Sequence, residues 1–259
     1  MKITTVLKSV TVAFSMYSRI PMPRFRWETE DMRYHLCFFP WVGGVIGILE
    51  YLWFLGVARF EIGPAAATLI ALSVPILVTG GFHLDGFMDT CDALSSWRTR
   101  EERLKILSDP HIGAFSVIRL ALFGLLYGAA LSELTAESRI LWMGTFFLAR
   151  CLSGYTVVTF PKAKQTGLAR TESDTAARRI ASILLLLQGG ICIAWMLWRS
   201  PAAGGIVLAI ALLGTLHYRR FSGTKFGGIT GDLAGWFLCR MELAMVLGLW
   251  AAGILTGIF

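Results

Sequence analysis

Several side chains that could do chemistry crowd into one polar stretch between two long apolar runs. Residues 80–113 read GGFHLDGFMDTCDALSSWRTREERLKILSDPHIG and contain His83, Asp85, Asp89, Asp92 and Asp109. If the segment is helical, Asp85, Asp89 and Asp92 fall within about 60° of one another on one face. These three residues, called the acidic stripe below, carry like charges that a divalent cation would relieve. Oxygen ligands alone suit a hard ion such as Mg²⁺ rather than zinc. The acidic stripe therefore predicts a metal site and, with it, phosphate chemistry.

An alternative interpretation treats this stretch as a solvated polar loop. Its acids would then only balance the basic residues that follow, which are Arg98, Arg100, Arg103 and Lys105. None of these stands four residues after an acid of the stripe, where helical ion pairs form. We therefore favour the metal site. His83, just before the stripe, is expected to act as a base, to bind phosphate, or to be a hydrogen-bonded histidine at a helix end.

A second informative stretch, RRFSGTKFGGITGD, ends at Asp232. Its glycines, among them Gly228 and Gly231, could present backbone N–H groups to an anion at a helix N-terminus, and Lys225 adds a positive charge. Asp232 would bring a further carboxylate to the first cluster if the two segments pack together. Glu242 lies about 15 Å further along the same helix. It is either a site residue or the ion-pair partner of an arginine, Arg240 or Arg119.

The composition is that of an integral membrane protein. The 259 residues are 55% hydrophobic and only 16% charged, with a mean hydropathy of +0.63, whereas soluble domains carry about 25% charged residues. Apolar runs of spanning length predict about seven transmembrane helices in a single all-α domain, residues 1–259. They lie near 36–58, 62–82, 112–132, 138–160, 180–198, 202–217 and 233–259, the run at 202–217 being the shortest.

The basic residues alternate between the connections. The N-terminal segment and the connections 83–111, 161–179 and 218–232 hold 18 of the 24 Lys and Arg, and the other connections hold 3. The positive-inside rule then predicts a cytoplasmic N-terminus and places the acidic stripe on the cytoplasmic side. The formal charge of +7 is thus a topology signal and indicates no nucleic-acid partner.

Shorter segments and isolated charges complete the predicted bundle. Residues 3–20 carry Lys8 and Arg19 within an apolar stretch and predict an interfacial helix. Residues 99–107, TREERLKIL, predict a short amphipathic helix on the cytoplasmic surface. Arg119 and Arg150 fall inside apolar runs and should face a polar interior, where their partner is either a diphosphate or a nearby acid.

The motifs together resemble the cobalamin synthase family, the adenosylcobinamide-GDP ribazoletransferases of bacteria and archaea. The resemblance rests on TGGFHLDGFMDTCD, ILSDPHIG and GGITGDLAG, and it includes SRIPMP, FPWVGGVIG, Arg150 and PKAKQTGL. The HLDGxxDxxD run is the specific part. Departures from the family's usual residues occur at Ala93, His111 and Ser116, and at Lys164, Gln165 and Thr166.

The resemblance implies a reaction. The adenosylcobinamide-phosphate moiety of adenosylcobinamide-GDP would pass to α-ribazole or its 5′-phosphate with release of GMP, in a multi-span enzyme of the bacterial inner membrane that needs Mg²⁺. We expect Asp85, Asp89 and Asp92 to hold the metal, and His83, Asp232 or Glu242 to act as base. Lys225, Arg119, Arg150 and the glycine turn with Gly228 and Gly231 would bind phosphate. A homo-oligomer, or a complex with other cobalamin-assembly enzymes, is open.

Two rival functions use the same residues. A lipid enzyme of the CDP-alcohol or prenyl diphosphate type also uses spaced aspartates with Mg²⁺, but the Ala-Arg expected after the first Asp-Gly pair is replaced by Phe87 and Met88, and a second Asp-rich box is missing. A transporter would spread Glu50 and the intramembrane arginines along a pathway and would show inverted repeats. The acids crowd at one side instead, which favours an enzyme.

Overall fold

The computed structural model describes residues 3–28, 30–164, 171–172, 174 and 176–256. Its helices run in chain order as α1 (Ile3–Tyr17), the 3₁₀ helix η1 (Asp31–Cys37), α2 (Phe39–Phe60), α3 (Pro64–Thr79), α4 (Phe82–Ser95), α5 (Arg100–Ile106), α6 (Ala114–Ser132), α7 (Ala136–Thr159), α9 (Arg178–Arg199), α10 (Pro201–Phe226) and α11 (Gly231–Thr256). Within these ranges the only β-structure is an isolated bridge between Lys162 and Ile229. The all-α fold class is confirmed.

Local sequence signals fix where these helices begin. Thr135 caps α7 by accepting a hydrogen bond from the Ser138 N–H, and Ser200 caps α10 with Pro201 at its first position. Thr99 and Glu102 form a reciprocal capping box on the short helix α5. The amphipathic segment predicted at 99–107 is therefore present as α5, Arg100–Ile106, with Thr99 as its N-cap.

Six of the described helices are long and apolar enough to cross a membrane, and α3 with α4 forms a bent pair that makes up to seven spans. The run predicted at 202–217 extends in the structure to Phe226. The run predicted at 62–82 is the 16-residue α3, which turns by 97° into α4. The prediction of about seven transmembrane helices agrees with this count only when the bent pair is taken as one span.

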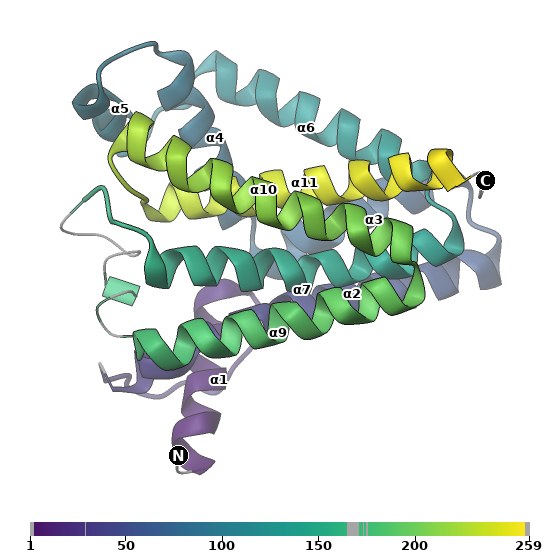
Figure 1. The fold of residues 1–259 in the computed structure, drawn as a ribbon, viewed down its shortest axis with the longest axis horizontal. Coiled ribbons are helices and arrows are strands. Elements are labelled where there is room, and N and C mark those ends of the chain that lie inside the picture. Colours follow the sequence, from purple (N-terminus) through teal and green to yellow (C-terminus); the bar gives the residue numbers. More distant parts are fainter. Residues whose placement is uncertain (1–2, 29, 165–170, 173, 175, 257–259) are drawn as a thin grey trace.

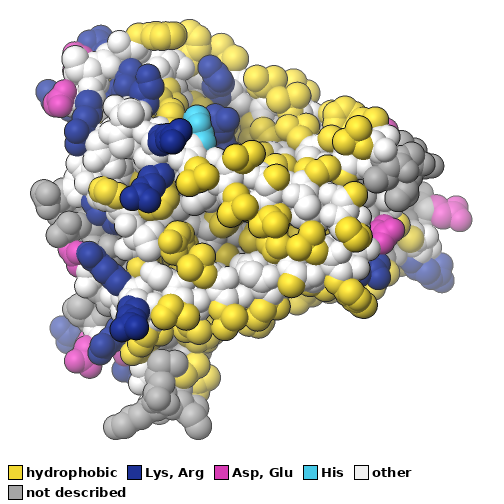
Figure 2. Space-filling view, viewed as in Figure 1, with side chains coloured by type: hydrophobic (Ala, Val, Ile, Leu, Met, Phe, Trp, Pro, Cys, Tyr) yellow, Lys and Arg dark blue, Asp and Glu magenta, His cyan; other side chains and the backbone are white. Residues whose placement is uncertain are grey.

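The helices that span run roughly parallel to one another, and α1 lies across them at one end (Figure 1). At that same end lie α4, α5, the connection after α7 and the turn before α11. Figure 2 shows most of the visible Lys and Arg at this end and hydrophobic side chains over the flanks of the bundle. We call it the acid end, because it contains the acidic stripe.

Helix α7 occupies the centre and packs against α2, α9 and α11. The α2–α7 contact depends on small residues, because a Cβ at Gly43 would collide with the carbonyl of Phe146, and one at Gly47 would lie 2.7 Å from the carbonyl oxygen of Met143. The small-xxx-small seam in the sequence is thus a true helix interface.

The N-terminal helix docks onto the acid end through a buried polar contact. The hydroxyl of Tyr17 donates to Glu172 and lies 3.1 Å from Nε2 of His35. Both Tyr17 and Glu172 are buried. Beyond α1, the Arg19 N–H donates to the carbonyl of Val78 at 2.7 Å, which ties this segment to the end of α3.

A methyl group at Gly43 should force α2 and α7 apart. We expect Gly43→Ala to lower the free energy of unfolding by about 1–3 kcal/mol, the usual cost of overpacking. The matched control is Gly44→Ala on the next position of α2, where a Cβ meets only a Phe147 ring carbon at 3.6 Å. Thermal unfolding in detergent measures both. Equal melting temperatures for the two variants would contradict the tight interface.

Glu172 should make stability depend on pH. Burial raises the pKa of this carboxyl from its ordinary 4.5 to about 7, although Tyr17 and Lys162 oppose the rise. The folded state therefore holds the proton more tightly, and this contribution to stability is complete below pH 4.5 and is lost as the pH rises through 7. We expect the melting temperature of the wild type to fall relative to that of Glu172→Gln between pH 5 and pH 8. Parallel curves for the two proteins would refute this.

Candidate active site

The acidic stripe lies on α4 at the acid end of the bundle. Asp85 is exposed, and Asp89 and Asp92 are partly buried. Asp85, Asp92 and Asp232 all lie near enough to Asp89 to repel its charge. In the described part of the chain, neither the Asp85 nor the Asp89 carboxylate accepts a hydrogen bond or forms an ion pair. The structure thus leaves two neighbouring carboxylates without a compensating charge.

The downstream basic residues do not balance these acids. Arg98 pairs with Glu102 at 3.2 Å, within its own segment. Arg100 donates to the carbonyl of Phe226 at 2.8 Å, and Arg103 to that of Lys225 at 3.4 Å. These contacts hold α5 against the end of α10. The solvated-loop alternative is therefore not supported.

Asp92 has a different environment from the other two acids. Its Oδ2 accepts the Gly113 N–H at 2.6 Å, and its Oδ1 accepts the Ser116 N–H at 3.0 Å. These N–H groups begin α6, where backbone donors lack intrahelical partners. Asp92 therefore caps α6 from across the turn, and its oxygens are less available to a metal than those of Asp85 and Asp89.

Asp232 reaches the acidic stripe because α4 and α11 approach closely. A Cβ at Gly86 would lie 2.8 Å from the Asp232 Cα, and one at Gly235 would lie 3.0 Å from the His83 carbonyl oxygen. The Thr230 hydroxyl donates to Asp232 and accepts from the Leu233 N–H, so it caps α11. The expectation that the two distant segments meet is confirmed by this packing.

These carboxylates do not form a closed metal cage. Among the described residues, no group of three or more His, Cys, Asp or Glu side chains is gathered tightly enough to hold a metal ion by itself. Mg²⁺ ordinarily uses one or two protein carboxylates, several waters and the substrate's phosphates. Asp85 and Asp89, unpaired and side by side on one helix face, fit that mode of binding.

The glycine-rich turn is less open than the sequence suggested. Gly227 and Gly228 adopt positive φ, and their N–H groups donate to Gly223 and Ser222. The Ile229 N–H donates to the carbonyl of Pro161 at 2.8 Å. The Gly228 N–H is thus already used inside the protein. Gly231 begins α11 beside the acids, and Lys225 is exposed at the end of α10.

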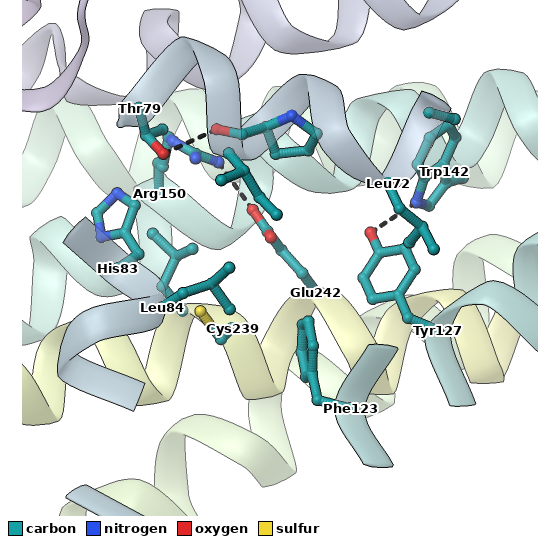
Figure 3. Close-up of a pocket in the computed structure, with 14 residues that line it drawn as sticks. Leu72, Thr79, His83, Leu84, Phe123, Tyr127, Trp142, Arg150, Cys239 and Glu242 are labelled. Carbon is teal, nitrogen blue, oxygen red and sulfur yellow. Dashed lines mark hydrogen bonds and ion pairs between the residues drawn. The ribbon is translucent and has the colours of Figure 1, made fainter. Parts of the chain in front are cut away.

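His83, Arg150 and Glu242 meet inside the bundle, where they line a cavity of about 60 Å³ (Figure 3). Arg150 pairs with Glu242 at 2.8 Å and donates to the carbonyl of Phe146 at 2.9 Å. The partner of Glu242 is therefore Arg150, not the Arg240 or Arg119 that the sequence suggested. The Nε2 of His83 is buried and has no hydrogen-bond partner among the described residues, and the centroids of the His83 and Phe82 rings lie 3.8 Å apart.

This buried pair is remote from the acidic stripe. Glu242 stands ten residues after Asp232 on α11, a rise of about 15 Å. Arg119 is also apart, since it lines a groove with Phe87 and Cys91, which stand on the face of α4 roughly opposite Asp85 and Asp89. The structure thus groups Asp232 with the acidic stripe but separates Glu242, Arg150 and Arg119 from it.

Sequence reasoning missed three residues near the site. Tyr17 and Glu172 line a small cavity together with His83 and Gly231, and Lys164 lies near enough to Asp232 to attract its charge. The Lys164 Nζ also donates to Ser108 at 2.7 Å. Of the basic connection 161–179, residues 165–170, 173 and 175 lie outside the described part of the structure, whereas Lys162 and Lys164 are described. Only the basic character of that loop signalled Lys164.

Comparisons with known proteins identify the family of this chain. A family model described as cobalamin-5-phosphate synthase matches residues 9–250. An adenosylcobinamide-GDP ribazoletransferase of Lachnoclostridium phytofermentans is 43% identical over 237 residues, 92% of this chain and 91% of that protein. The enzyme of that name from Clostridium perfringens is 31% identical, covering 93% and 96%, and that of Listeria monocytogenes is 28% identical, covering 94% and 100%. No solved structure matches significantly. The chain belongs to the cobalamin-5-phosphate synthase family.

Proposed function

We propose that this protein transfers the adenosylcobinamide-phosphate group of adenosylcobinamide-GDP to α-ribazole or its 5′-phosphate. A ribose hydroxyl attacks the phosphorus next to the corrinoid, the phosphoanhydride bond breaks, and GMP leaves. The relatives' name and the full-length family match support this reaction. The observation in the structure that carries it is the unpaired pair Asp85 and Asp89, placed where a polar substrate can reach them.

In this proposal, the protein lies in a bacterial inner membrane and its site opens to the cytoplasm. The acid end gathers the N-terminal segment and the basic connections, as Figures 1 and 2 show. Basic residues near span ends mark the cytoplasmic side. Nucleotide substrates are made in the cytoplasm, so this orientation delivers them to α4.

Mg²⁺ is the proposed cofactor, held by Asp85 and Asp89 with Asp232 beside them. When bound, it would neutralise charge on the transferred phosphoryl group and on the departing GMP. Asp92 supports the site by fixing the start of α6 against α4, through its two backbone hydrogen bonds. It is therefore a positioning residue in this proposal, and its predicted role as a metal ligand is secondary.

Asp232 is the proposed acceptor of the hydroxyl proton. Of the three candidates, it alone lies with the acidic stripe, whereas Glu242 is ion-paired inside the bundle and His83 is buried among Phe82 and Phe39. Thr230 fixes the Asp232 carboxylate from one side. Lys164 and Lys225 supply positive charge for phosphate oxygens at the same end.

Removing either unpaired carboxylate should slow Mg²⁺-dependent turnover strongly. We expect Asp85→Asn and Asp89→Asn to reduce GMP release by at least about 100-fold, since each loses a charge that faces the metal. Glu133→Gln, exposed at the opposite end, is the control and should match the wild type. Release of CMP or pyrophosphate from the corresponding substrates would instead identify a lipid enzyme, and near-normal turnover of either Asn variant would refute the metal role.

Asp92 should respond differently from the other two acids. Asp92→Asn keeps one acceptor for the α6 backbone but loses the other, so we expect a stability loss of about 1 kcal/mol. We expect the Mg²⁺ concentration that gives half the maximal rate to rise more than tenfold in Asp89→Asn. In Asp92→Asn the same concentration should change less. An equal rise in both variants would show that Asp92 is a full metal ligand.

A further inference from the structure

A groove between α4, α6 and α11 is not used by the proposed reaction. Its volume is about 320 Å³, and its walls are mainly the side chains of Phe87, Leu122, Leu126, Trp236 and Leu247. Two charged residues also line it, Arg119 on α6 and Arg240 on α11. The groove therefore combines an apolar trough with two guanidinium groups, which is the form of a site for an amphiphile.

Among the described residues, neither the Arg119 nor the Arg240 guanidinium forms an ion pair or a hydrogen bond, and each lies near enough to the other to repel it. Arg240 lies over the Trp236 ring, 4.8 Å from its centroid. The nearby carboxylate of Asp92 is occupied by the α6 backbone. Both side chains are exposed, and two neighbouring guanidinium groups without a counter-ion near the bilayer surface would be stabilised by a bound anion.

The depth of the arginines matches a lipid headgroup region. Arg119 is the sixth residue of α6 and Arg240 the tenth of α11, so they lie roughly 8 Å and 14 Å along helices that both begin at the acid end. Leu122 and Leu126 follow Arg119 on its helix and are 47% and 41% exposed. The groove thus opens sideways through residues that face hydrocarbon, with its charge toward the acid end.

We propose that the groove binds one anionic phospholipid of the leaflet at the acid end. Its phosphate lies between Arg119 and Arg240, and an acyl chain follows Leu122 and Leu126 toward the membrane interior. Basic pockets between transmembrane helices on this side suit such headgroups. The substrate diphosphate is a poorer occupant, because the groove is on the face of α4 opposite Asp85 and Asp89. The lipid would contact Phe87 and Cys91, which lie on the face of α4 opposite Asp85 and Asp89, and would thereby help to hold α4 in place.

Native mass spectrometry and thermal unfolding of the full chain in detergent test this proposal. We expect phosphatidylglycerol to remain bound as one molecule per chain and to raise the melting temperature, and phosphatidylcholine to do neither. Arg119→Gln and Arg240→Gln should each weaken phosphatidylglycerol binding about fivefold, as expected for one basic side chain at an anionic surface. The control is Arg59→Gln, because Arg59 is exposed near the end of α2 that lies away from the acid end.

Further measurements separate this site from structural damage and from substrate binding. Arg119→Lys and Arg240→Lys keep the charge and should retain most of the phosphatidylglycerol binding. Inorganic phosphate or GDP should not displace the lipid. Equal binding of both lipids, unchanged binding in the Gln variants, or displacement by GDP would each overturn the proposal, the last by assigning the groove to substrate. These experiments measure lipid binding rather than GMP release. The lipid proposal can therefore fail while the proposed reaction holds, and the reverse is also true.

Discussion

The close contact between α4 and α11 is the constraint on which the rest of the site depends. Gly86 lets the α4 backbone approach Asp232, and Gly235 lets α11 approach the backbone of His83. Without these glycines, carboxylates separated by about 140 residues in sequence could not share one end of the bundle. The close approach also concentrates negative charge. Among the described residues, no cationic side chain forms an ion pair with Asp85 or Asp89. The packing therefore creates an electrostatic cost that a bound cation would relieve.

The surrounding helices hold this contact in place. Gly80 and Gly81 adopt positive φ, which turns α3 into α4 by 97°. Asp92 ties α4 to α6, while α5 is held to the end of α10 by Arg100. Deeper in the bundle, the buried Arg150–Glu242 pair joins α7 to α11. Polar contacts of this kind orient helices in a setting where apolar packing alone distinguishes poorly between neighbours.

Much of the fold could be predicted from the sequence, because length, hydropathy and caps are local properties. The acidic stripe and the short α5 follow from residue spacing, whereas the association of Asp232 with α4 was expected only on the condition that the two segments pack together. The rest depends on tertiary contacts. Nothing in the sequence showed that Glu242 would form an ion pair with Arg150, or that Asp92 would cap α6. Nor did it show that the Gly228 N–H would donate a hydrogen bond to the Ser222 carbonyl. The positive charge of Arg119 suggested that it binds phosphate. The sequence does not show that Arg119 lies on the side of α4 opposite Asp85 and Asp89.

Asp85 and Asp89 are proposed to bind a divalent cation that also holds a nucleotide's phosphates. Mn²⁺ shares the preference of Mg²⁺ for oxygen ligands and can be observed by electron paramagnetic resonance. In the presence of GDP, we expect one bound Mn²⁺ with hyperfine coupling to ³¹P, and loss of that signal when both aspartates are changed to Asn. A coupled Mn²⁺ that persists in the double variant, or a bound Mn²⁺ with no ³¹P coupling in the wild type, would contradict it.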